Sequence, residues 1–235
     1  MMFRLRRQLP VSNAFSDLHD SLVAVEKAAE LIGFDGMPND EPPLAEVRTA
    51  RSPKELIEAA TAAGAAILKI LEKDAKLREL YTDLLHKFAY LATIGDALAK
   101  LLDQLKALDR SSPQRYLENL SRLIREFLAV EASFAEHKKL DNWHRCKTVV
   151  AEKVSAEQFV WLSAFYMNFA VFAALCATAG EEAAGILDEL AKLIAQGMSD
   201  KPAVIKGFKL AIQAVRCLRR IMKALTQLLK ALTKA

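Results

Sequence analysis

The chain has 235 residues, of which 52% are hydrophobic and 26% charged, with only eight glycines and seven prolines. A chain of this length can bury a core without disulfide or metal staples, and its richness in Ala, Leu, Glu and Lys predicts an all-α fold and excludes a strand-rich one. The net charge of +4 is uneven: residues 201–235 carry nine Lys and Arg and no acid, so the preceding 200 residues sum to −5. Such an asymmetry concerns partners and self-association rather than fold.

Redox chemistry and targeting are constrained by the cysteines and the start of the chain. Cys146, Cys176 and Cys217 are odd in number and fall within helical patterns, and no secretory signal opens the sequence. These features favour an intracellular, reducing compartment without disulfides. Residues 1–12 carry three arginines and no acid, and we interpret them as a basic N-terminal arm. An organelle presequence shares this composition and is the alternative.

Apolar residues at alternating spacings of three and four predict that residues 13–235 form one helical bundle domain. The first helix is expected over about residues 13–32, before Gly33. The acidic, proline-containing residues 34–52 are interpreted as a connecting loop, with a short helical turn near residues 44–47.

The second helix has a well-formed start. Ser52 can cap it, Pro53 suits its first position, and Glu55 can complete a capping box. Small side chains over residues 59–66 then predict that a neighbouring helix approaches closely, in tight bundle packing rather than a membrane helix interface.

The apolar period continues from Asp74 to Leu108, with a kink or break expected near Gly95. Ser112 opens a further helix that is expected to reach about Lys139.

Four more helices are predicted in the second half of the chain. Asp141 is expected to cap a short helix, and Ser155 with Gln158 to form a capping box for the next one, which ends at Gly180. A separate amphipathic helix follows until Gly197, and the last helix covers residues 201–235. The total is seven or eight helices, without strands or an internal repeat.

The stretch FVWLSAFYMNFAVFAALCATAG, residues 159–180, contains no charged side chain. As a helix it would reach about 33 Å, enough to span a hydrocarbon core. Asn168 lies in its middle, however, and it is flanked by Glu157 and Glu181 rather than by cationic anchors. We therefore expect a central helix of the bundle, surrounded by other helices.

Residues 201–235 contain an unbroken apolar stripe from Val204 to Leu232 and a parallel cationic stripe. Helices with a merely solvated polar face usually interleave both signs of charge, so the missing acids favour an anionic partner, with a solvated face as the alternative. The residues predicted to bind this partner are Lys206, Lys209, Arg216, Arg219, Arg220, Lys223, Lys230 and Lys234.

These patterns predict a non-catalytic interaction protein whose basic C-terminal helix docks to an acidic protein or an anionic membrane surface. One alternative is a membrane-inserting, pore-forming-like protein that hides residues 159–180 when soluble. Another is a bundle that encloses an apolar ligand against Phe165, Phe169 and Phe172. Nucleic acid is disfavoured because the cationic face has no stacking aromatic residue, and homo-oligomerisation through the amphipathic helices is left open.

We predict no catalytic, cofactor or metal residue. Asp83 with His86 and Asp141 with His144 have a spacing similar to the Glu-x-x-His pairs of di-iron bundles, but two further carboxylates are missing. The histidines and cysteine of residues 137–146 lack the further ligands that a zinc site needs. No phosphate-binding loop or nucleophile elbow occurs, and an active site dispersed in sequence is the alternative to a non-enzymatic role.

Overall fold

The computed structural model describes Leu44, Val47 and Ala50 and residues 52–108, 112–129, 140–198 and 200–234. All regular secondary structure in these residues is helical, which confirms the all-α prediction. The α-helices are α3 (Pro53–Leu71), α4 (Arg78–Lys106), α5 (Pro113–Ala129), α7 (Asp141–Lys153), α8 (Ala156–Ala195) and α9 (Lys201–Lys234), and a short 3₁₀ helix, η1 (Ala75–Leu77), precedes α4.

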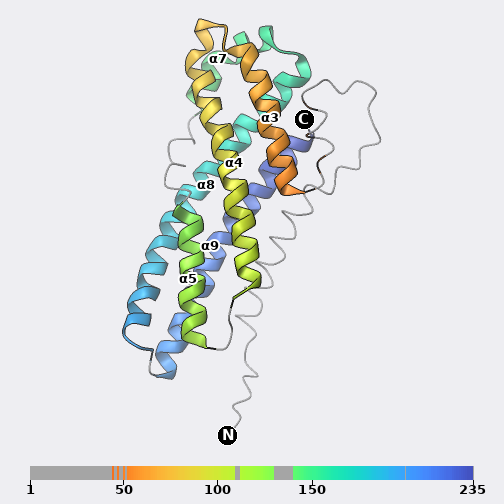
Figure 1. Cartoon of the computed structure of the whole chain (residues 1–235). Helices are drawn as coiled ribbons and strands as arrows, with labels where there is room; N and C mark the ends of the chain where they lie inside the picture. The colour runs from red at the N-terminus through yellow and green to blue at the C-terminus, as the bar shows by residue number, and fades with distance from the viewer. Residues whose placement is uncertain are drawn as a thin grey trace.

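The helices form an elongated bundle built on the antiparallel pair α8 and α9 (Figure 1). At one end of this pair, α3 packs against α4, and α7 lies beside the start of α8. Towards the other end, α5 packs against both α8 and α9. Buried side chains from all six helices join in one hydrophobic cluster.

Three helix boundaries follow the local signals of the sequence. Ser52 Oγ accepts a hydrogen bond from the Glu55 N–H (3.2 Å) at the start of α3. At the start of α8, Ser155 Oγ accepts from the Gln158 N–H (3.2 Å), and Gln158 Oε1 accepts from the Ser155 N–H (3.3 Å), which completes the predicted capping box. Gly197 follows α8 with φ of +91°, a left-handed conformation that suits glycine and ends the helix.

Two aspartates at helix starts, Asp200 and Asp141, differ in whether they cap the helix. Asp200 Oδ1 accepts from the Ala203 N–H (2.8 Å), so it caps α9. The prediction that Asp141 caps α7 was wrong: Leu140 occupies the cap position and Asp141 lies in the first turn. A carboxylate in the first turn still interacts favourably with the helix dipole, which accounts for an acid at this place.

The predicted count of seven or eight helices is not matched, since the described residues contain six α-helices. Two expected interruptions are absent: α4 continues through Gly95, and α8 continues through Gly180. One glycine inside a helix costs only about 1 kcal/mol relative to alanine. Gly180 is flanked by Ala and Glu, which are good helix formers, and no proline or capping residue follows it to end the helix.

Several predicted segments lie outside the described residues. These are the N-terminal arm at residues 1–12, the helix at 13–32, most of the loop at 34–52, and residues 130–139 of the helix that begins as α5. Within the loop, the side chains of Leu44, Val47 and Ala50 are buried and belong to the hydrophobic cluster.

The predicted close approach of a helix to the small residues of α3 is confirmed at Gly64. A Cβ atom at this position would lie 2.4–2.5 Å from three ring atoms of Phe88 on α4. The Phe88 ring stacks on Phe165, with 4.1 Å between the ring centroids, and on Trp161 at 6.0 Å. The missing side chain at Gly64 therefore lets α4 place an aromatic ring between α3 and α8.

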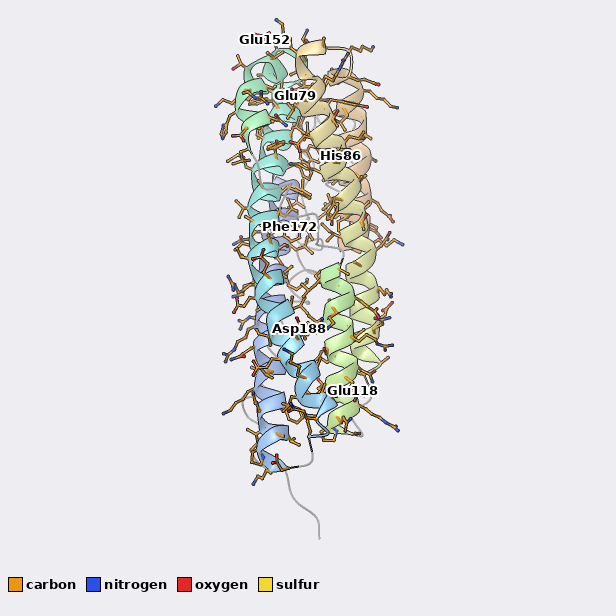
Figure 2. The ribbon with its side chains drawn as sticks, turned by 90° about the vertical axis from the view of Figure 1, so that its left-hand side faces the viewer. Glu79, His86, Glu118, Glu152, Phe172 and Asp188 are labelled. Atoms are coloured by element: carbon orange, nitrogen blue, oxygen red, sulfur yellow. The ribbon has the colours of Figure 1, made fainter. Side chains whose placement is uncertain are left out.

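Most of the aromatic interior comes from α8. Phe165 contacts Phe169 with a centroid distance of 5.3 Å, and Phe169 contacts Phe172 at 6.1 Å. All three rings are buried. Figure 2 shows Phe172 between α8 and the helices opposite, whereas the exposed side chains of Glu79 and Glu152 lie at the surface.

We expect Gly64→Ala to reduce the free energy of unfolding by about 1–3 kcal/mol, because the Phe88 ring is held between neighbouring rings and has little room to move. Gly185→Ala is the matched control, because Gly185 is an exposed residue of α8 and no atom lies within 4 Å of a Cβ added there. This substitution should raise the free energy of unfolding by about 0.5–1 kcal/mol. Urea denaturation of both variants measures the difference. Equal stability of the two variants would contradict this account of the contact.

Candidate functional site

The cations predicted to bind a partner lie on one side of α9, opposite its buried side. Apolar residues of the same helix, from Leu210 to Leu232, are buried in the core. Arg219 is half-buried at the edge of the cationic stripe, and the side chain of Lys234 lies outside the described residues. The exposed members of the stripe are Lys206, Lys209, Arg216, Arg220, Lys223 and Lys230.

Two of these cations pair with acids on α8. Lys206 Nζ lies 2.8 Å from Glu189 Oε1, and Arg220 Nη1 lies 2.7 Å from Glu182 Oε2. All four side chains are about half exposed, so each pair contributes at most about 1 kcal/mol to stability. No such pair is formed beyond Arg220 among the described residues of the stripe.

The other exposed cations keep their charge unpaired within the described part of the chain. No acid of the described residues lies within 4.0 Å of the side-chain nitrogens of Lys209, Arg216, Lys223 or Lys230. Trp161 Nε1 donates to the Leu232 carbonyl oxygen (3.1 Å), which fixes the start of α8 beside the end of α9. Because the helices are antiparallel, the second half of α9 runs beside the uncharged segment of α8, where no acid is available.

The uncharged segment of α8 is enclosed on only one side. Trp161 and Phe165 are buried, but Val160, Met167 and Val171 are 53%, 40% and 53% exposed. The expectation that other helices surround this segment therefore holds for part of its circumference. By length and composition, α8 is the one described helix that could cross a membrane, and half of its most apolar window is buried.

Three polar side chains within this segment bond to their own helix. Asn168 Nδ2 donates to the Ala164 carbonyl oxygen (2.8 Å), and Ser163 Oγ donates to the Phe159 carbonyl oxygen (2.7 Å). Thr178 Oγ1 likewise donates to the carbonyl four residues earlier (3.2 Å). Since these groups are satisfied locally, they place no requirement on a neighbouring helix or on water.

A buried polar cluster joins α4 to α8. The Lys87 side chain is fully buried, and its Nζ donates to Asp83 Oδ1 (2.7 Å) and lies 4.8 Å from the centroid of the Tyr166 ring. The Tyr166 hydroxyl donates to the other oxygen of Asp83, and Trp143 stacks on the Tyr166 ring at 5.4 Å. Burial lowers the pKa of Lys87, although Asp83 opposes this, and burial together with Asp83 raises the pKa of Tyr166.

This cluster ties α4 to α8 in the interior of the bundle, where the Lys87 side chain has no contact with solvent. Sequence reasoning missed it. The spacing of four between Asp83 and Lys87 was a visible signal, but that spacing is also common on exposed helix faces. What distinguishes this pair is Tyr166, which comes from a distant part of the chain.

The two Asp-x-x-His pairs do not converge. His86 and His144 are exposed, while Asp83 bonds to Lys87 and Tyr166. Within the described ranges, no group of three His, Cys, Asp or Glu side chains is arranged to hold a metal ion. His137 lies outside these ranges.

No protein-family model matches the chain, and neither a curated protein nor a solved structure matches it. Function is therefore inferred from the surfaces of α8 and α9.

We expect Asp83→Asn to destabilise the protein by about 3 kcal/mol, because it leaves the buried ammonium of Lys87 without a counter-ion. Lys87→Met should change the free energy of unfolding by less than about 1 kcal/mol. Asp83 still accepts the hydrogen bond from the Tyr166 hydroxyl, and the Asp83 side chain is 19% exposed. Chemical denaturation of both variants tests this order. A larger loss for Lys87→Met than for Asp83→Asn would be evidence against it.

Asn168→Leu should change the free energy of unfolding by no more than about 1 kcal/mol. The half-buried amide bonds only within α8, and the Ala164 carbonyl keeps its backbone hydrogen bond when the side chain is replaced. Thermal melting of the variant measures the effect. A loss of several kcal/mol would mean that Asn168 has a buried partner on another helix.

Proposed function

We propose that this chain is a non-catalytic docking protein that binds an anionic membrane surface through the cationic stripe of α9. The observation that supports this best is the exposed row of Lys209, Arg216, Lys223 and Lys230, which has no acid within ion-pair distance among the described residues. An anionic surface would supply the charge that the protein itself does not provide there.

The shape of this row favours an extended partner over a small anionic ligand. From Lys209 to Lys230 the cations follow a straight helix for about 32 Å. Each Lys or Arg near an anionic bilayer gains about 1 kcal/mol, so four cations acting together give useful affinity even after partial screening by salt. A small ligand would meet one or two of them.

Membrane insertion is a second candidate, and the apolar character of α8 favours it. Insertion would require α8 to leave the stack that Phe165 and Trp161 form with Phe88 of α4, and would expose the buried Lys87. Docking requires neither change. Leakage of a dye from vesicles accompanies insertion, and its absence during binding indicates docking.

Flotation with vesicles that contain phosphatidylserine should recover the protein at low salt, and recovery should fall as salt rises. Replacing Lys209, Arg216, Lys223 and Lys230 together by Gln should weaken binding at least about 100-fold. A control variant removes the same charge from exposed positions outside α8 and α9 and should bind like the wild type; it carries Gln at Lys69, Lys73, Arg115 and Lys147.

Failure of the wild type to float with anionic vesicles at low salt would contradict the proposal. An equal loss in the control variant would show that only net charge matters and that α9 is not the site. Binding to soluble polyglutamate but not to vesicles would assign the stripe to an acidic protein instead.

A further inference from the structure

An apolar row on α8 lies on the side of that helix that borders Lys223 and Lys230, the unpaired cations that follow Arg220 on α9. Val160, Met167 and Val171 are exposed, and their spacings of seven and four put them on one side of the helix. Glu182 follows Val171 by eleven residues, about three turns, so it shares this side, and Glu182 is the residue that pairs with Arg220 of α9. The apolar row is therefore the continuation of the α8 side that borders the cations of α9.

This surface combines exposed apolar groups, unpaired cations and a lack of acids. Residues 159–180 carry no charge, and Lys223 and Lys230 lie on the half of α9 that runs beside them. The Ser163 and Thr178 hydroxyls and one N–H of Asn168 donate within α8, so contact with an apolar phase leaves these bonds intact. A bilayer interface offers both matching features, with acyl chains for the apolar row and anionic headgroups for the lysines.

A second copy of the chain is a poorer occupant of this surface. It would present the same lysines, so a face-to-face approach would bring like charges together without any acid between them. An anionic bilayer has the opposite charge and needs no matching groove.

We infer that Val160, Met167 and Val171, flanked by Lys223 and Lys230, enter the headgroup and upper acyl region of an anionic bilayer, with α8 lying along the membrane plane. This inference rests on the proposed function and adds the apolar contact to it. The contact ends where Glu181 and Glu182 follow the uncharged segment, because an anionic surface repels these carboxylates. Gly185, on the same side of α8 beyond these acids, stays in water.

A polarity-sensitive fluorophore at single cysteines tests this arrangement. Cys146→Ala removes the partly exposed native thiol, while Cys176 and Cys217 are buried. In this background, nitrobenzoxadiazole is attached at Val171→Cys and, as a control on the same side, at Gly185→Cys. With phosphatidylserine vesicles, emission from position 171 should shift to the blue and rise several-fold, whereas emission from position 185 should change little.

Matched serine variants give a second readout that needs no label. The double variant Val160→Ser with Val171→Ser should bind anionic vesicles about tenfold more weakly, because half-exposed apolar side chains lose their transfer to lipid. Ile70→Ser with Leu85→Ser replaces apolar residues that are 41% and 43% exposed on other helices, and should bind like the wild type. Thermal melting verifies that both variants are folded.

The results separate this inference from the proposed function. If the wild type binds vesicles but position 171 reports water and the α8 serine variant binds normally, the inference is overturned and docking by α9 stands. If the wild type does not bind vesicles, both fail. A blue shift that acidic polypeptide produces and vesicles do not would also overturn the inference.

Discussion

The bundle depends on the aromatic contact between α4 and the inner side of α8. Phe88 stacks on Phe165 and is covered by Gly64, so three helices meet where any side chain on α3 would collide with the ring. The same two helices are joined again by Asp83, five residues before Phe88, and Tyr166, which directly follows Phe165. These contacts draw the aromatic residues of α8 inward and thereby determine which of its residues face outward.

The orientation of α8 in turn controls how far the charge of α9 is neutralised. All acids of α8 except Glu157 lie at or beyond Glu181, and two of them, Glu182 and Glu189, pair with Arg220 near the middle of α9 and with Lys206 near its start. The second half of α9 borders a helix side that carries only apolar and small side chains. Two features of the sequence, an uncharged block and an acid-free cationic helix, thus become one surface because the helices are antiparallel.

Local signals in the sequence predicted the fold class and several helix ends, because they act over one turn. Ser155 with Gln158 and Gly197 are examples. Single residues were less reliable. Gly180 was expected to end a helix, but α8 continues through it because the small cost of one glycine is outweighed by the good helix formers around it. The exposed cations of α9 could be listed from periodicity, but which of them have acid partners depended on the position of α8. Lys87 looked like an ordinary surface lysine, and only the fold brings Tyr166 to its counter-ion.

The division of side chains on α8 favours shallow contact over insertion. The residues best suited to hold a helix at a membrane interface, Trp161 and Tyr166, are buried in the bundle, and the exposed row consists of valine and methionine. In the proposed membrane contact, such a row would add only a modest apolar term, and most of the affinity would come from lysine and arginine, which salt screens. Turning α8 around would exchange the two sides, but it would break the stack on Phe88 and take the Tyr166 ring and hydroxyl away from Lys87 and Asp83 of α4. The contacts that build the core therefore oppose insertion while leaving reversible docking without structural cost.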